Sequence, residues 1–262
     1  MHFACTIPYV LSDLESYIEK VKANNKNVKV SALCTSEQGR EVPLFTIGNE
    51  ESGKAIVFTS RHHCCEASPS FLLEGLVDYI SEEMPAEILD NYCFYIAPMM
   101  DVDGVENGDQ GKQRIPHDHN RDYEEKIYNS VRALTDFAAD KNVVAFMDYH
   151  CPGLADSVPY LYYDSTSDKD EVMLFASYLK AAQTEAGEKN TILYDGSRDY
   201  DDKHFKACSK GYFYLEKGAK LSTTFEFPYT GKVGNEYTPD KVRAYGKIVG
   251  KAYENYILNE LK

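Results

Sequence analysis

The order of apolar and polar positions along the chain predicts strands that alternate with helices. Short runs rich in β-branched and other apolar residues predict strands, and apolar positions three and four residues apart predict helices. The expected strands cover residues 28–33, 42–47, 55–59, 92–98, 143–149 and 220–227. Two helices are expected to begin near Ser12 and Ser68. Three more are expected over residues 123–139, 172–186 and 239–261. A polar loop is expected over residues 101–121 and irregular chain over residues 197–218.

This alternation is typical of an α/β domain whose sheet is covered by helices on both faces. The sequence contains no internal repeat, no low-complexity tract and no linker rich in Pro, Gly and Ser. We therefore expect one domain over residues 1–262. In such sheets the chemistry sits at the strand ends and in the loops that follow them.

Charge and cysteine content narrow the classes of partner. The 28 Lys and Arg residues against 42 Asp and Glu residues give a net charge of -14, which disfavours binding to nucleic acid or to an anionic membrane surface. No apolar run approaches the length of about 18 residues that a transmembrane helix needs. Seven cysteines without a CxxC pair, after a start that lacks a signal-peptide pattern, predict reduced thiols and a cytoplasmic location. Secretion stays open, because a trimmed chain would lack its signal peptide.

Three candidate metal ligands stand where predicted strands stop. His63 and Glu66 follow the strand at 55–59, and His150 follows the strand at 143–149. Two imidazoles and one carboxylate can hold zinc and leave a fourth position open for water. An HxxE pair arises often by chance, so a surface His beside a surface Glu is the competing interpretation.

Polar residues elsewhere in the chain strengthen the metal interpretation. Arg114, Asn120 and Arg121 form a candidate clamp for a carboxylate, because guanidinium groups match carboxylate geometry; a solvated polar loop is the alternative. Glu226 lies between two phenylalanines on a strand that reads as buried. Burial would raise its pKa toward the range of a general base, unless the side chain points outward from an edge strand.

Taken together, these segments resemble the zinc carboxypeptidases of the M14 family, the carboxypeptidase A-like metallopeptidases. The resemblance follows the order of the whole chain, although Asp101 stands where that family usually has Asn. The segments that carry it are ALCTSEQGREVPLFTIG, SRHHCCE, APMMDVDGVENG, DHNRDY, MDYH and TTFEF.

The resemblance implies a mixed central sheet and one Zn²⁺ per chain. His63, Glu66 and His150 would bind the zinc, and a water would complete the site. Asp118 would accept a hydrogen bond from His63 and so orient that ligand.

The resemblance also implies hydrolysis of the C-terminal amide bond of a peptide that has a free carboxylate. Glu226 would be the general base that activates the zinc-bound water and passes the proton to the leaving amine. Arg114 would polarise the scissile carbonyl and stabilise the oxyanion. Asn120 and Arg121 would grip the terminal carboxylate of the substrate.

Several neighbouring residues are less specific. We expect Cys64, Cys65 and Cys151 to be small buried residues, although thiolates also bind zinc. Arg61 and His62 have no assigned role, and His62 is expected to be a solvent-exposed neighbour of the ligands.

Two features of the substrate site stay open at this stage. Counting back from Glu226 places the family's substrate-covering tyrosine near His204, and Tyr200 and Tyr212 are the nearby alternatives. The family forms its specificity pocket from the segment that corresponds to residues 209–216, which contains Lys210 and lies close to Lys206, and a cationic pocket would suit an acidic side chain. A charged surface loop is the competing interpretation.

Two other functions compete with a peptidase. A zinc amidohydrolase of the aspartoacylase or succinylglutamate desuccinylase type, acting on acyl amino acids, shares the same plan of ligands. A binding module with an inactive site would have lost a ligand or the base, and the sequence retains both. Oligomeric state, physiological substrate and the residue removed are not determined by the sequence.

Overall fold

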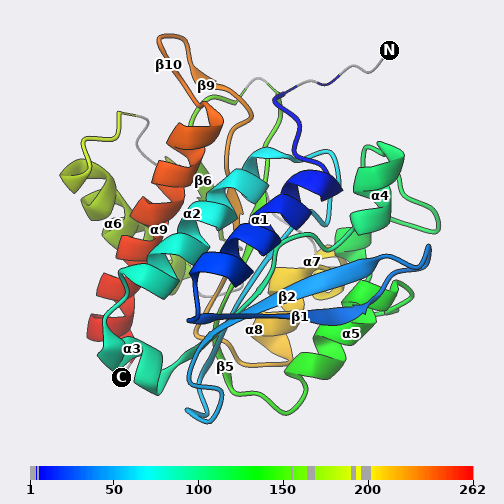
Figure 1. The fold of residues 1–262 in the computed structure, drawn as a ribbon, viewed down its shortest axis with the longest axis horizontal. Helices are drawn as coiled ribbons and strands as arrows, with labels where there is room; N and C mark the ends of the chain where they lie inside the picture. The colour runs from blue at the N-terminus through cyan, green and yellow to red at the C-terminus, as the bar shows by residue number, and fades with distance from the viewer. Residues whose placement is uncertain are drawn as a thin grey trace.

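A mixed β-sheet of eight strands forms the centre of the part of the chain that the structure describes (Figure 1). The structure is a computed structural model and describes residues 4, 6–154, 156–163, 169–189, 193–195 and 202–261. In spatial order the strands are β1 (Val28–Thr35), β2 (Glu41–Gly48), β4 (Cys93–Ala97), β3 (Ala55–Ser60), β5 (Val143–His150), β8 (Leu221–Glu226), β6 (Tyr160–Tyr162) and β7 (Leu193–Asp195). β4, β3, β5 and β8 run parallel to one another, whereas the pairs β1–β2, β2–β4 and β8–β6 are antiparallel. β6 and β7 pair in parallel.

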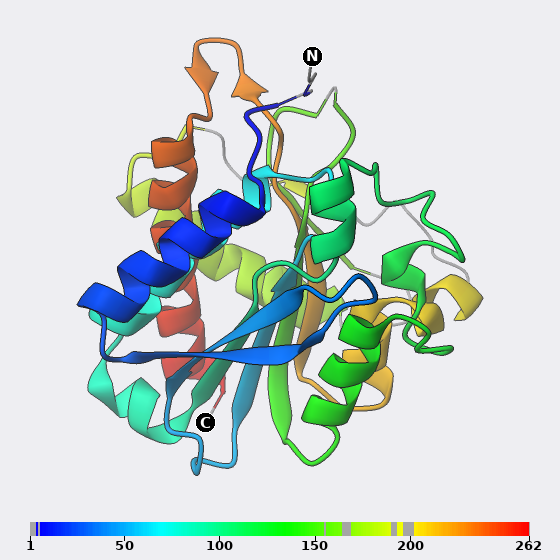
Figure 2. The same ribbon diagram turned by 45° about the vertical axis from the view of Figure 1, so that its right-hand side comes forward.

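Helices cover both faces of this sheet, as the views in Figures 1 and 2 show. One face packs against α1 (Leu11–Asn24), α2 (Ser68–Glu82), α6 (Lys169–Glu185) and α9 (Pro239–Glu260). The other face packs against α5 (Asn129–Ala138) and α8 (Ser209–Leu215). The remaining elements are α3 (Ala86–Asn91), α4 (Val102–Asn107), the 3₁₀ turn η1 (His119–Arg121), α7 (Asp202–Ala207) and the hairpin of β9 (Gly231–Lys232) and β10 (Asn235–Glu236).

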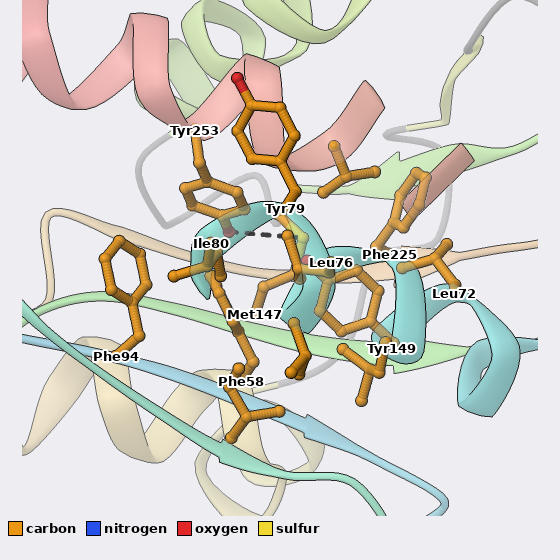
Figure 3. Packing of buried hydrophobic residues seen from close by; sticks show 14 of the residues in the cluster. Phe58, Leu72, Leu76, Tyr79, Ile80, Phe94, Met147, Tyr149, Phe225 and Tyr253 are labelled. Carbon is orange, nitrogen blue, oxygen red and sulfur yellow. Dashed lines mark hydrogen bonds between the residues drawn. The ribbon is translucent and has the colours of Figure 1, made fainter. Parts of the chain in front are cut away.

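The side chains of the central strands divide between two hydrophobic clusters, one on each face. In β3, Ile56 and Phe58 join the cluster under α2 and α9, whereas Ala55 and Val57 join the cluster under α5 and α8. Successive side chains of a strand point to opposite faces, so a strand covered on both sides must be apolar throughout. Figure 3 shows the first cluster, where Phe58 and Tyr253 pack with ring centroids 4.8 Å apart.

Helices α2 and α9 cross at a contact that requires glycine. A Cβ on Gly75 would overlap the carbonyl of Arg243, and a Cβ on Gly246 would overlap the carbonyl of Leu72. The two backbones therefore approach closely, and the larger side chains beside them are directed into the core. This crossing fixes α9 against the sheet and so closes the first cluster.

The predicted mixed α/β fold is confirmed, and most strand and helix boundaries shift by only one to three residues. The expected loop over 101–121 contains α4 and η1, and the expected irregular stretch over 197–218 contains α7 and α8, although residues 197–201 lie outside the described part. The short strands β6 and β7 were not predicted, because three residues carry too little periodicity.

The helix expected over 123–139 begins only at Asn129. The carboxylate of Asp122 accepts hydrogen bonds from the backbone amides of Ile127 and Tyr128, at 2.9 and 2.8 Å, and Lys126 has a φ of 55°. The side chain of Asp122 thus holds a turn where the pattern suggested the first turns of a helix.

Among the described residues, no helix combines the length and the apolar character that crossing a membrane requires. Cys34, Cys64, Cys65, Cys93, Cys151 and Cys208 are free thiols, as expected, and Cys5 lies outside the described residues.

The glycine crossing generates a stability prediction. The substitution Gly246→Ala should lower the free energy of unfolding by about 1–3 kcal/mol, because the added methyl group meets the backbone of α2 and cannot relax. Thermal or urea unfolding measures the change. Lys247→Ala, on the exposed side of the same helix, is the control and should change stability by no more than about 0.5 kcal/mol. Equal stability of Gly246→Ala and the unaltered chain would contradict the close crossing.

Candidate metal centre

Three parallel strands bring the predicted ligands to one edge of the sheet. His63 and Glu66 lie in the loop after β3, His150 is the last residue of β5, and Glu226 is the last residue of β8. His150 and Glu226 are direct partners in the β5–β8 register. Because the carboxyl ends of parallel strands meet at the same edge, residues more than 150 positions apart converge there.

The three ligand side chains point their donor atoms at one another. The Nδ1 atoms of His63 and His150 are 3.1 Å apart. Each of them also lies close to a carboxylate oxygen of Glu66, at 2.9 Å for His63 and 2.8 Å for His150. All three side chains are buried, so the prediction that His63, Glu66 and His150 form one cluster is supported by their geometry.

The loop that carries the first two ligands is held by a buried arginine. Arg61 has a φ of 61°, which ends β3, and its guanidinium donates to the carbonyls of Cys64 and Tyr9 and to the hydroxyl of Ser70. The following turn closes with a 3.1 Å bond from the Glu66 amide to the His63 carbonyl. These bonds place the two ligands on the same side of the loop.

A second segment packs against this loop at Gly111. Its φ is 107°, and a Cβ there would come within 2.6 Å of the His63 Cα atom. Only glycine accepts both the conformation and the approach. The chain that carries Lys112 and Arg114 is thereby brought against the ligand loop.

Each histidine donates its other ring nitrogen to a carboxylate. His63 Nε2 lies 3.1 Å from Asp118, and His150 Nε2 lies 2.6 Å from Asp148. Because a carboxylate accepts, these contacts place a proton on Nε2 and leave Nδ1 as the ligand atom of the neutral ring. The predicted contact between Asp118 and His63 is therefore present in the structure.

Asp148 is buried and accepts from several groups at once. It was not predicted, although it precedes His150 by two positions on β5, a spacing that places both residues on one face of a strand. The donors are Thr59 Oγ1 at 2.7 Å, His62 Nδ1 at 2.9 Å, Ser209 Oγ at 2.7 Å, Asn120 Nδ2 at 3.0 Å and His150 Nε2 at 2.6 Å. The expectation that His62 is solvent-exposed is wrong, because its side chain is 0% exposed.

Opposite charges set the protonation of the cluster. Burial alone would lower the pKa values of both ligand histidines, but Glu66 and Asp118 raise that of His63, and Asp148 and Glu66 raise that of His150 well above its usual range. Burial would raise the pKa of Asp118, but its hydrogen bond to His63 lowers it to about 2.

Glu226 differs from the other acids of the site. Burial raises its pKa to about 7, and Glu66 adds to the rise. Its Oε2 atom is buried and has no hydrogen-bond partner among the described residues. A carboxyl group without a partner, next to a set of metal ligands, is available to exchange a proton. The alternative of an outward-facing edge residue is excluded, since β8 lies between β5 and β6.

The candidate clamp residues are engaged within the protein to different degrees. Arg114 pairs with Asp101 and Asp109. Asn120 donates to Asp148 and accepts from the Ser209 amide at 3.0 Å, so its side-chain amide is used internally. Arg121 is half-buried and donates to the Asn120 carbonyl at 2.7 Å.

A cation that the motif analysis did not single out faces the ligands directly. Lys112 Nζ lies 3.8 Å from a carboxylate oxygen of Glu66, and its side chain is 52% exposed. Its only signal in the sequence is its place between Asp109 and Arg114, and nothing in that pattern separates it from a surface lysine.

The three positions considered for a substrate-covering tyrosine differ in their surroundings. Tyr200 lies outside the described residues. Tyr212 packs against Tyr123, with ring centroids 5.7 Å apart, and its hydroxyl donates to the Thr135 carbonyl of α5. His204 is exposed on α7.

The donor set fits zinc. Two imidazole nitrogens and a carboxylate are ligands that zinc prefers, and they converge from three directions on one point. Tetrahedral zinc with bonds near 2.0–2.1 Å holds its ligand atoms about 3.3 Å apart, close to the 2.8–3.1 Å separations here. Three protein ligands also leave a coordination position open, as catalytic sites do.

The fold and this donor set are typical of metallohydrolases that bind zinc through two histidines and one glutamate. The chain matches the family described as zinc carboxypeptidase over residues 14–130 and 107–248. It therefore belongs to the M14 zinc carboxypeptidase family, a family of peptidases, and the resemblance drawn from the motifs is confirmed.

Curated relatives agree with this family. Cytosolic carboxypeptidase 2 of Mus musculus is 29% identical over 167 residues, which cover 56% of this chain and 19% of that protein. Cytosolic carboxypeptidase 1 of Homo sapiens is 27% identical over 175 residues, which cover 57% of this chain and 14% of that protein. The alignments thus span about a fifth or less of the length of these relatives.

Solved structures share the fold. A metallo-carboxypeptidase from Burkholderia cenocepacia superimposes with a TM-score of 0.81 at 18% identity, covering 95% of this chain and 70% of that one. Carboxypeptidase A from Helicoverpa armigera gives a TM-score of 0.72 at 12% identity, covering 100% of this chain and 76% of that one.

The raised histidine pKa values predict how zinc affinity depends on pH. Zinc binds neutral imidazole, so binding must displace protons from His63 and His150, whose pKa values lie above the ordinary 6.5. We expect the zinc Kd to fall by about tenfold per pH unit for each proton displaced as long as the pH stays below the raised pKa values, so the fall continues above pH 6.5 and levels off once both rings are neutral. Chelator competition at several pH values measures it. His63→Ala should bind no stoichiometric zinc, and a pH-independent Kd would contradict this electrostatic assignment.

Proposed function

We propose that this chain is a zinc metallocarboxypeptidase that hydrolyses the C-terminal amide bond of a peptide. The single observation that supports it most is the buried carboxyl of Glu226, whose Oε2 atom has no hydrogen-bond partner within the described part of the chain, beside the cluster of His63, Glu66 and His150. A ligand set alone would serve a binding protein equally well. A proton-exchanging group next to it is what hydrolysis of an amide requires.

The proposed roles follow from the surroundings of each residue. His63, Glu66 and His150 would hold the zinc, which supplies Lewis-acid polarisation and a lowered pKa for water. Glu226 accepts a proton from the attacking water and returns it to the amine of the leaving residue. Its raised pKa keeps the carboxyl near the balance of its two protonation states at neutral pH.

Cations at the site would bind the negative charge of the substrate. We propose that Arg121 contacts the terminal carboxylate, with Asn120 holding the segment that carries it. Polarisation of the scissile carbonyl by Arg114 requires its ion pairs with Asp101 and Asp109 to open. Lys112 faces the ligand cluster without such a change, and we propose that it shares this role.

The substitution Glu226→Gln tests the reaction itself. It should leave zinc bound, because Glu226 is not one of the ligands, and lower kcat by about 10²–10⁴-fold through loss of the proton acceptor. The assay combines zinc content with hydrolysis across a panel of peptides that differ in the C-terminal residue.

Glu216→Gln removes an equivalent charge from an exposed position at the C-terminal end of α8 and serves as the control. Near-normal turnover by Glu226→Gln would remove Glu226 from the mechanism. If N-acyl amino acids are cleaved and peptides are not, the chain is an amidohydrolase of the acyl-amino-acid type and the peptidase proposal fails.

We further propose that the substrate side chain is acidic. Lys210 is buried at the start of α8, and its ammonium lies 5.6 Å from the Tyr162 ring centroid and 5.7 Å from that of Phe205. A cation enclosed by aromatic rings, beside the Tyr162 of β6 that pairs with Thr224 of β8, is a strong source of positive potential. Lys206, by contrast, is exposed on α7.

This proposal predicts a change in selectivity. Lys210→Gln should lower kcat/KM for a peptide ending in Glu by about 10–100-fold, the effect of losing one charge-assisted contact, and should affect a peptide ending in Ala much less. Lys206→Gln is the matched control and should leave both values within about threefold. Equal losses on both peptides, or a preference of the unaltered chain for a C-terminal Lys, would contradict the acidic pocket.

The cellular setting stays a proposal as well. Six described cysteines are free thiols and the relatives cited above are named cytosolic, which supports a cytoplasmic location.

A further inference from the structure

A chain of buried hydrogen bonds leads away from the third ligand into the core of the site. His150 Nε2 lies 2.6 Å from one oxygen of Asp148, and His62 Nδ1 lies 2.9 Å from the other. His62 Nε2 lies 2.8 Å from the Tyr123 hydroxyl. The side chains of His62 and Asp148 are both 0% exposed, so water does not compete for these contacts.

The directions of these bonds are set by chemistry. The Asp148 carboxylate can only accept, so the facing nitrogens of His62 and His150 both carry protons. Thr59 occupies the His62 side of the carboxylate, and Ser209 and Asn120 occupy the His150 side. Both oxygens are therefore fixed in place, and with them the plane of the carboxylate that orients the His150 ring.

The two imidazole rings have nearly the same orientation on either side of Asp148. The rings of His62 and His150 lie 15° from parallel, with centroids 6.0 Å apart, and Asp148 bridges them. Tilting His62 would rotate Asp148, and rotating Asp148 would turn the Nδ1 atom of His150 away from His63 and Glu66. A partner of this kind behind a metal ligand is typically worth 10–100-fold in metal affinity.

We propose that His62 is a positioning residue of the metal centre, which acts through Asp148 to hold His150 in its metal-binding orientation and tautomer. This inference rests on the proposed zinc site. His62 does not touch the metal or the substrate. It supplies one directed hydrogen bond, from Nδ1, that keeps Asp148 aligned with His150.

The same residues could be taken for a second metal site, because His62, Asp148 and His150 also place ligand atoms close together. The hydrogen bonds argue against it. Thr59, Ser209 and Asn120 donate protons to Asp148, and an ion there would have to displace them. The arrangement is that of a carboxylate saturated with donors rather than one awaiting a cation.

The test measures zinc affinity by chelator competition, using zinc alone and no substrate. His62→Leu removes the donor at similar volume and should weaken zinc binding by about 10–100-fold. His119→Leu is the matched control: His119 is also buried, its Nε2 contacts Ser130, and no hydrogen bond among the described residues joins it to Asp148. It should leave the Kd within about threefold.

A pair of polar variants keeps the test decisive if His62→Leu does not fold. An Asn side chain can place its amide N–H where His62 Nδ1 stands, whereas a Gln side chain places it toward Tyr123. We expect His62→Asn to bind zinc within about threefold of the unaltered chain and His62→Gln to lose about tenfold or more. The visible spectrum of the Co²⁺-loaded protein should change for His62→Gln and not for His119→Leu.

The outcomes distinguish failure of the zinc site from failure of the role of His62. If the unaltered chain binds no zinc, the metal centre fails and the inference with it. If the unaltered chain binds zinc and His62→Leu or His62→Gln matches the His119 control, the metal centre stands and the role of His62 is wrong. Two zinc ions per chain, with one lost in His62→Leu, would show that His62 is a ligand and would overturn its positioning role.

Discussion

The parallel register of β3, β5 and β8 is the constraint on which the site depends. It places the end of each strand at one edge of the sheet, so that the loop after β3, the last residue of β5 and the last residue of β8 meet. A slip of one residue in β5 would reverse its faces and direct His150 away from Glu66. The two hydrophobic clusters pack against both faces of these strands, and so they hold the candidate ligands His63, Glu66 and His150 together.

The site is also a balance of buried charge. Burying an unpaired charge is costly, and here carboxylates and imidazoles compensate one another across short hydrogen bonds. Asp118 holds the far side of His63, and Asp148 holds the far side of His150. Glu226 stands apart from this scheme because its Oε2 atom has no hydrogen-bond partner among the described residues. The paired groups hold the geometry of the cluster, and Glu226 is the acid to which we assign the proton transfer in the proposed function.

Loops supply the rest of the site through contacts that no local pattern reveals. The buried guanidinium of Arg61 ties the ligand loop to the N-terminal segment and to α2, and Gly111 lets a distant loop approach His63. Because of that approach, Lys112 faces the ligands while Arg114 is paired with two aspartates. The sequence motif favoured Arg114 as the cation that contacts the substrate. Spacing along the chain cannot show which cation is already paired with neighbouring acids.

The sequence by itself determined the fold class, most of the elements, the cluster of His63, Glu66 and His150 and the place of the buried Glu226 beside it. It could do so because strand periodicity is local and because these residues stand directly at strand ends. Only the tertiary structure decided that His62 is buried, that Asp148 joins it to His150, and that the amide of Asn120 is used inside the protein. Those facts depend on which side chains meet across strands and loops far apart in the chain, and an isolated pattern of residues contains no information about such distances.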